Sequence, residues 1–177
     1  MTKEIIISGF GGQGVVSSGI ILGYAGLFEN KHVTFFPSYG AEMRGGTANC
    51  SVVISTEPVA SPIVANPDVV IIMNEPSLAR FEPTVKPGGV LFYNKTLIKS
   101  TPKRSDIEVI PVEANAIAEE LGHGRIANMV MLGVLIKKTQ LLELQTLKKA
   151  QRQRFAKANE EQLSLNDKAL DRGYELV

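Results

Sequence analysis

The fold class of this chain is predicted first from the segment Glu4-Ile-Ile-Ile-Ser-Gly-Phe-Gly-Gly-Gln-Gly-Val-Val16. This segment opens with three consecutive isoleucines, a run typical of a buried strand. Gly9, Gly11 and Gly14 follow with the spacing G-x-G-x-x-G, and an apolar segment then continues to Phe28. Apolar or small residues recur at helical spacing in that segment, at Val16, Ile20, Gly23 and Leu27. A strand, a glycine turn and a helix in this order predict the beginning of an α/β sheet.

The rest of the chain continues the alternation of strands and helices. Strands are predicted at 32–36, ending before Pro37, and at 48–55, 68–73, 90–93 and 107–110; helices are predicted at 76–81, 114–121 and 126–136 and in the charged tail from 141 onward. This order predicts a Rossmann-like α/β fold with an open, twisted, mostly parallel sheet and flanking helices. The apolar–polar alternation of 48–55 favours antiparallel pairing of that strand, with one covered face. We expect residues 1–140 to form this domain and residues 141–177 to form a helical C-terminal extension packed on it.

Composition excludes several classes of protein. The 177 residues include 19 Lys and Arg against 18 Asp and Glu, and a net charge of +1 gives no field that would attract nucleic acid or an anionic membrane. One cysteine cannot form an internal disulfide, nor hold an iron–sulfur cluster without other chains. Residues 5–28 are uncharged and long enough to span a bilayer, but seven glycines favour a strand, a loop and a buried helix instead. We therefore expect a cytoplasmic protein.

The glycine turn has the chemistry of an anion site. Glycines let a phosphate approach backbone N–H groups, and the positive end of the following helix dipole favours the negative charge. A dinucleotide site also needs an acidic residue at the end of the second strand, whereas Phe35-Phe36-Pro37 offers none, which disfavours NAD. Two interpretations remain open here, a site for a phosphate or nucleotide-like ligand and a tight turn without a ligand.

A second motif, Ser38-Tyr-Gly-Ala-Glu-Met-Arg-Gly-Gly-Thr47, gathers charge and glycine at the end of the second predicted strand. The guanidinium of Arg44 can bind a phosphate or a carboxylate through two hydrogen bonds. Glu42 would alternatively neutralise Arg44 in a structural clamp, and Gly45-Gly46 would let a ligand or a partner backbone come close. A self-stabilised surface loop is the remaining alternative. No pair of a nucleophile and a base is present in either motif.

Together, the motifs at 9–15 and 37–50 resemble the gamma subunit of 2-oxoacid:ferredoxin oxidoreductases, in particular the 2-oxoglutarate and 2-oxoisovalerate members of the pyruvate/ketoisovalerate oxidoreductase catalytic domain family. The likeness extends through the apolar helix at 128–133 and into the tail near Glu175. It implies an assembly that converts a 2-oxoacid to acyl-CoA and CO2 and reduces ferredoxin. It also implies thiamine diphosphate, Mg2+ and [4Fe-4S] clusters on partner chains only: alpha and beta subunits and a ferredoxin-like delta subunit.

The resemblance also implies roles for individual residues. A part in coenzyme A binding is carried over to the glycine turn, at Gly9, Gly11, Gly12, Gln13 and Gly14. A place at the subunit junction beside the active site is carried over to the second motif, at Tyr39, Glu42, Arg44, Gly45, Gly46 and Thr47. No residue of this chain is expected to be catalytic or to bind a metal, so the isolated chain should be inactive. Two other functions stay open: a stand-alone nucleotide-binding Rossmann protein and a non-catalytic scaffold subunit.

The remaining reactive or charged residues, and one apolar helix, have simpler interpretations. Cys50 falls on the apolar face of its strand and is predicted to be a core residue. His123 is predicted to belong to a helix cap and His32 to an exposed strand position, while the apolar helix at 126–136 should lie in the core or in a subunit interface. A basic run predicts a solvated helix face, a dock for an acidic partner or a surface that steers coenzyme A; it comprises Lys137, Lys138, Lys148, Lys149, Arg152, Arg154 and Lys157.

Overall fold

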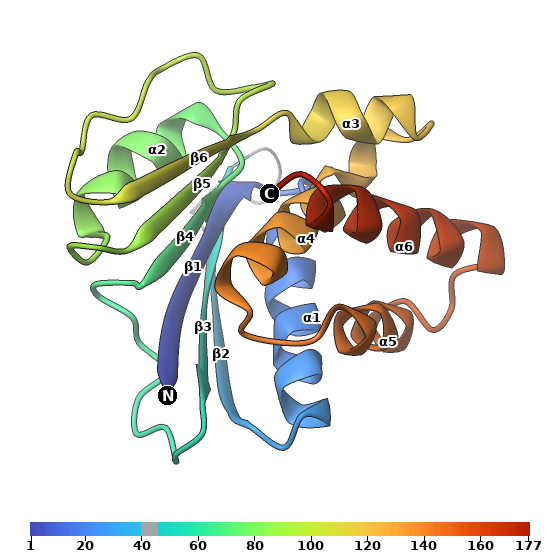
Figure 1. The fold of residues 1–177 in the computed structure, drawn as a ribbon, viewed down its shortest axis with the longest axis horizontal. Helices are drawn as coiled ribbons and strands as arrows, with labels where there is room; N and C mark the ends of the chain where they lie inside the picture. The colour runs from blue at the N-terminus through green and yellow to red at the C-terminus, as the bar shows by residue number, and fades with distance from the viewer. Residues whose placement is uncertain (40–45) are drawn as a thin grey trace.

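The computed structural model describes residues 1–39 and 46–177, which form one six-stranded sheet with helices on both faces (Figure 1). The strands are β1 (Thr2–Phe10), β2 (His32–Tyr39), β3 (Thr47–Ser55), β4 (Val69–Ile72), β5 (Val90–Asn94) and β6 (Glu108–Val112), in the spatial order β2-β3-β1-β4-β5-β6. β1, β4, β5 and β6 pair in parallel, whereas β3 pairs antiparallel with both β1 and β2. β3 is thus the single reversed strand in the described sheet, and the predicted mostly parallel α/β fold is confirmed.

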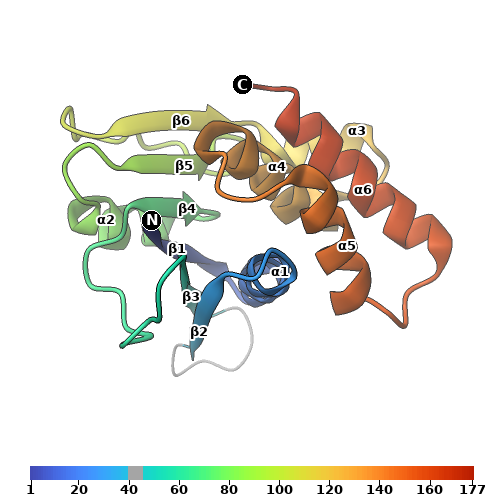
Figure 2. The ribbon, with the colours of Figure 1, turned by 60° about the horizontal axis from the view of Figure 1, so that its bottom comes forward.

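Helices cover the two faces unequally (Figures 1 and 2). They are α1 (Val15–Phe28), α2 (Glu75–Phe81), α3 (Ala114–Glu120), α4 (Ala127–Thr139), α5 (Leu144–Arg154) and α6 (Glu160–Tyr174), with 3-10 turns η1 (Glu82–Thr84) and η2 (Gly124–Ile126). The larger core joins one face of the sheet to α1 and α4, and includes Ile5, Ile7 and Val130. The smaller core joins the other face to α2, through Ile6 and Leu78. No described helix is long and apolar enough to cross a membrane.

Both strands next to the second motif differ from expectation. β2 continues through Pro37 to Tyr39, because an edge strand tolerates a residue that cannot donate a ladder hydrogen bond. The antiparallel pairing of β3 is confirmed, but the expected single covered face is wrong, since Ser51 and Ser55 are also buried. The hydroxyl of Ser55 lies 2.8 Å from that of Thr2 and accepts a hydrogen bond from a backbone N–H, so its burial leaves no orphaned polar atom.

Two glycines of α1 pack directly against the neighbouring strands. A Cβ at Gly19 would lie 2.6 Å from the sulfur of Cys50, and a Cβ at Gly26 would lie 2.6 Å from the side chain of Val33. Because glycine has no side chain, the helix can approach β2 and β3 this closely. Leu27, which belongs to the stripe seen in the sequence, is 56% exposed, so the side of α1 against the sheet is a different one.

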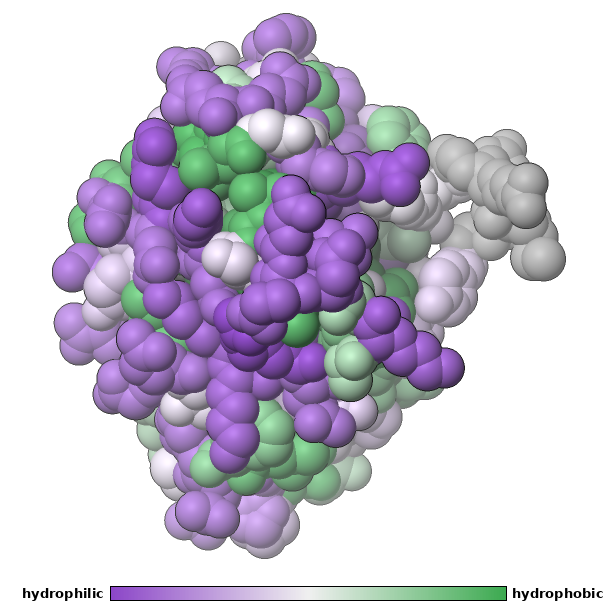
Figure 3. Space-filling model, turned by 90° about the vertical axis from the view of Figure 1, so that its right-hand side faces the viewer, coloured by the Kyte–Doolittle hydropathy of each residue, from purple (hydrophilic) through white to green (hydrophobic). Residues whose placement is uncertain are grey.

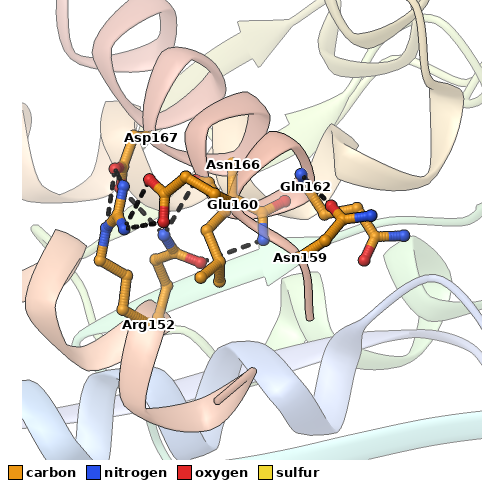
Figure 4. Close-up of polar contacts among 8 residues, drawn as sticks. Arg152, Asn159, Glu160, Gln162, Asn166 and Asp167 are labelled. Carbon is orange, nitrogen blue, oxygen red and sulfur yellow. Dashed lines mark hydrogen bonds and ion pairs between the residues drawn. The ribbon is translucent and has the colours of Figure 1, made fainter. Parts of the chain in front are cut away.

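The tail forms two helices held together by a polar network around the buried side chain of Gln151 (Figure 4). The side-chain amide of Gln151, which is completely buried, donates hydrogen bonds to the Leu163 carbonyl at 3.1 Å and to Asp167 at 2.9 Å. Arg152 pairs with Asp167 at 2.7 Å and with Glu160 at 2.9 Å. α5 packs on α1 and α6 packs on α4, and both helices contribute to the larger core. The boundary at residue 140 stays a prediction.

The basic run mostly serves internal contacts. Its contacts are Lys137 over the Tyr174 ring, Lys138 with Glu108, Lys148 with Asp171, Lys149 over the Phe28 ring, Arg152 with Asp167, and Arg154 with the Ser17 hydroxyl. These pairs join the tail helices to one another and to the sheet domain. The face presented by α5 and α6 is still mainly hydrophilic, as Figure 3 shows.

Candidate functional site

The glycine turn is closed by the side chain of Gln13. Its Oε1 accepts a hydrogen bond from the backbone N–H of Phe10 at 2.7 Å, and its Nε2 donates to the carbonyl of Met73 at 3.1 Å. Gln13 therefore ties the end of β1 to the end of β4, and both polar atoms of its amide are engaged within the chain. Gly9 lies under this bridge, where a Cβ would approach Gln13 Oε1 to 2.6 Å and Met73 Cβ to 2.7 Å. Gln13 therefore holds the turn in shape, and Gly9 leaves the space that this bridge needs.

Two further glycines adopt left-handed backbone conformations, with φ of +97° at Gly12 and +75° at Gly14. A Cβ at Gly12 would meet no atom within 4 Å, whereas a Cβ at Gly14 would lie 2.5 Å from Nδ2 of Asn128 on α4. That amide nitrogen donates to the Ser18 hydroxyl at 3.1 Å and approaches the Gly14 carbonyl at 3.4 Å. Gly12 thus leaves open space beside the turn, and Asn128 of α4 holds the first turn of α1 in place through Ser18 and the Gly14 carbonyl.

The N-terminus of α1 faces this space without a cap. Gly14 occupies the N-cap position with no side-chain hydrogen bond, and the first turn contains no acidic residue. The first backbone N–H groups of a helix have no partner within the helix and carry the positive end of its dipole. The N–H groups of Gly11 and Gln13 bond carbonyls of the chain, whereas the first N–H groups of α1 have no partner among the described residues and are available to an anion.

The two sequence motifs meet in space. The backbone N–H of Gly11 donates a 3.0 Å hydrogen bond to the carbonyl of Gly46, and Thr47 pairs with Phe10 across β1 and β3. Tyr39, at the end of β2, is 68% exposed. The other three site residues predicted in this motif, Glu42, Arg44 and Gly45, lie outside the described residues. The structure thus joins the ends of both motifs at one corner of the sheet.

A hollow of about 540 Å³ opens on one side of the turn, at the carboxyl ends of β1, β4 and β6. Gly12 and Gln13 line it together with Asn115, His123 and Arg125 from the segment that links β6 to α4. Arg125 is exposed and makes no ion pair with residues 1–39 or 46–177. A guanidinium beside uncapped helix amides is an arrangement that suits a phosphate.

A smaller hollow of about 290 Å³ lies on the other side of the turn. Phe10, Val16, Ser17 and Tyr39 line it together with the glycines and Ala48. Its lining is mainly apolar and aromatic, with one hydroxyl from Ser17 and one from Tyr39. The turn is thus flanked by a basic hollow and an aromatic one.

The sequence reasoning missed Asn115, Arg125 and Asn128. Arg125 follows the break Gly122-His-Gly124 that ends one predicted helix, and Asn128 is a polar residue inside an otherwise apolar run; these are the available signals. The prediction for His123 is confirmed at the backbone, since its N–H bonds the Ala118 carbonyl at the end of α3. Its ring also accepts the Arg125 N–H at 3.2 Å and lines the basic hollow.

The core and surface predictions near the site hold. Cys50 is completely buried, and burial raises the pKa of its thiol to about 12, so it is protonated and unreactive at neutral pH. His32 is exposed on β2, as expected. Within 1–39 and 46–177, His, Cys, Asp and Glu side chains nowhere gather in groups of three that could hold a metal ion.

A glycine turn at the start of a helix, next to a hollow at the carboxyl ends of parallel strands, defines an α/β domain with a candidate ligand site at a sheet edge. A family model described as pyruvate ferredoxin/flavodoxin oxidoreductase matches residues 4–176. The chain belongs to this family.

Three relatives illustrate the range of the family. The 2-oxoglutarate synthase subunit KorC of Methanocaldococcus jannaschii is 38% identical over 100% of this chain and 95% of its own. The ketoisovalerate oxidoreductase subunit VorA of Methanothermobacter marburgensis is 46% identical over 75% of this chain, but this match spans only 28% of VorA. The solved 2-oxoglutarate:ferredoxin oxidoreductase of Magnetococcus marinus, with 2-oxoglutarate, coenzyme A and succinyl-CoA bound, superposes with a TM-score of 0.90 at 29% identity, covering 99% of this chain and 31% of that one.

Proposed function

We propose that this chain is the gamma subunit of a 2-oxoacid:ferredoxin oxidoreductase. Its glycine corner, where the glycine turn Gly9–Gly14 meets Gly46 and Thr47, binds the phosphates of coenzyme A. The contact between Gly11 and Gly46 carries this proposal, because it assembles both motifs beside the hollow that contains Arg125. Coenzyme A bears a diphosphate and a 3′-phosphate, which match free helix amides and a guanidinium. The Magnetococcus relative, which aligns with nearly the whole chain, has coenzyme A bound.

The reaction of the assembled enzyme joins the acyl group of a 2-oxoacid to the thiol of coenzyme A, releases CO2 and passes an electron pair to ferredoxin. Alpha and beta subunits and a ferredoxin-like delta subunit supply thiamine diphosphate, Mg2+ and the [4Fe-4S] clusters. This chain has one cysteine, which is buried, so it has no thiolates for a cluster of its own. The 2-oxoacid is 2-oxoglutarate or 2-oxoisovalerate, after the KorC and VorA relatives. A cytoplasmic location belongs to the same proposal.

Within this chain, the residues of the site have different proposed roles. Gly12 leaves room for the phosphate, Gln13 and Asn128 hold the turn in shape, and Arg125 supplies the positive charge. The second motif, from Tyr39 to Thr47, is proposed to lie at the junction with the partner subunits, where the acyl group is transferred.

Coenzyme A affinity of the assembled complex tests the proposal. Replacement of Arg125 by alanine should raise the Kd about 10- to 100-fold, since hydrogen bonds to charged groups contribute about 1.5–3 kcal/mol. Lys157→Ala is the control, because it removes the same charge from an exposed position in the tail. Isothermal titration calorimetry with coenzyme A and with its form lacking the 3′-phosphate would show which phosphate Arg125 meets. Equal affinities of Arg125→Ala and the unmodified complex would disprove the assignment.

The two other functions predict different results. A stand-alone nucleotide-binding protein would bind NAD(H) saturably as an isolated chain. A scaffold subunit would support assembly, yet coenzyme A affinity would not respond to any substitution at the glycine corner. We expect neither result, and we expect the isolated chain to be colourless and inactive with 2-oxoacids.

A further inference from the structure

α1 has an unusual composition for a helix near the surface. Its sequence, VVSSGIILGYAGLF, contains no charged residue. A helix at the surface of a globular protein normally presents a polar face to water, whereas a helix that is apolar on all sides is normally buried. The composition therefore predicts that every side of α1 is covered in the working protein.

Among the described residues, the sheet covers one side of this helix and α5 covers another. Gly19 and Gly26 face Phe35 and Val33 of β2. On another side, Arg154 and Lys149 of α5 reach Ser17 and Phe28. Figure 2 shows α1 nearly end-on between these two elements.

The third side carries an apolar strip. Val16, Ile20 and Leu27 project from it, within an arc of about 40° at 100° per residue. Leu27 is 56% exposed, while Val16 and Ile20 are half-buried. These three residues are called the α1 strip below.

The surroundings of the α1 strip also lack charge. Residues 5–28, 32–39 and 46–56 contain no Asp, Glu, Lys or Arg, although these types make up 21% of the chain. The core of a protein–protein interface is depleted of charged residues and enriched in aromatic ones. The aromatic hollow, lined by Val16, Phe10 and the exposed Tyr39, continues the strip to the glycine corner. The apolar surface is therefore continuous with the junction proposed above.

The lengths of the relatives indicate what covers this surface. This chain matches 28% of VorA and 31% of the Magnetococcus chain, so in both proteins the equivalent domain belongs to a polypeptide about three times as long. We infer that the α1 strip docks onto the subunit that holds the rest of the oxidoreductase, an inference that rests on the proposed function. A stable interface buries roughly 800 Å² on each partner, so the strip forms one part of a contact that includes the aromatic hollow.

Site-specific photo-crosslinking in the co-expressed complex tests the inference. A photoreactive phenylalanine analogue at Leu27 should form crosslinks to the subunit that corresponds to the rest of the VorA polypeptide, and crosslinks to a different subunit instead would count against the inference. The same analogue at Leu97, which is 43% exposed near the opposite edge of the sheet, is the control and should give fewer crosslinks. Crosslinks from Leu27 to a second copy of this chain would overturn the inference, and so would an active complex without crosslinks at Leu27.

An affinity measurement adds a second readout. Leu27→Asp should weaken association with the purified alpha and beta subunits at least about tenfold, as for a residue in an interface core. Leu97→Asp should not, and circular dichroism should show both variants folded. If Leu27→Asp binds normally while Arg125→Ala loses coenzyme A, the docking surface is wrong and the proposed function stands. If the unmodified chain joins no such subunits, the proposed function fails and the inference fails with it.

Discussion

Gly14→Ala should destabilise the chain far more than an alanine at another left-handed glycine. At a φ of +75° alanine costs about 1–2 kcal/mol. The new Cβ would also lie 2.5 Å from Nδ2 of Asn128 and displace that buried side chain from Ser18. A buried polar group left without a partner costs about 1–3 kcal/mol. We therefore expect Gly14→Ala to lower the free energy of unfolding by about 2–5 kcal/mol.

Gly88 is a matched control for this experiment. Its φ is also +75°, but an added Cβ would meet no atom within 4 Å, so Gly88→Ala should show only the backbone cost. Urea unfolding followed by circular dichroism measures both variants. In an Asn128→Ala background, Gly14→Ala should cost no more than Gly88→Ala does, because the clash has been removed. Equal destabilisation by Gly14→Ala and Gly88→Ala in the unmodified background would contradict the predicted clash between the Gly14 Cβ and Asn128.

Three further predictions concern other parts of the fold. Burial alone would raise the pKa of Glu29, but the Glu143 N–H and Lys31 outweigh this and hold the pKa below 4.5. The ionised carboxylate therefore stabilises the fold above pH 4.5, and this contribution is lost as the pH falls. Glu29→Gln should reduce stability at pH 7, and the stability difference between variant and unmodified chain should shrink in acid denaturation curves. Gly173→Ala should lower the free energy of unfolding by about 1–3 kcal/mol, and with it the urea midpoint, because its Cβ would overlap a backbone carbonyl of α4. An unchanged midpoint would contradict this packing. The Cys50 thiol, with a pKa of about 12, should react with a thiol reagent at neutral pH only after unfolding, and fast labelling of the folded chain would show that it is accessible.

The sequence was sufficient for features that depend on near neighbours. β1, the glycine turn and α1 are consecutive, and each has its own local signal in isoleucine, glycine or helical spacing. The antiparallel pairing of β3 could also be predicted from its alternation. The end of β2 was misjudged because a proline breaks a central strand but not an edge strand, and the position of a strand in the sheet depends on pairings with distant segments.

The site could be predicted only in part, for the same reason. Arg125 and Asn128 lie more than a hundred positions from the glycine turn along the chain, and only the packing of α4 against α1 brings them to it. The basic run was interpreted as an exposed surface because its partners lie on other elements of the fold. Lys138, for example, pairs with Glu108 on the edge strand β6.

Because α1 is anchored at both ends, it couples distant parts of the molecule mechanically. Asn128 fixes its first turn, and Glu29, just after its last turn, accepts the Glu143 N–H at 2.8 Å. A helix of this length is a stiff rod roughly 21 Å long. A force that tilts the rod at Leu27 must also reorient the amides at its opposite end, beside Gly12. A subunit that binds near Leu27 would therefore reorient the backbone N–H groups at the N-terminus of α1 without contacting them.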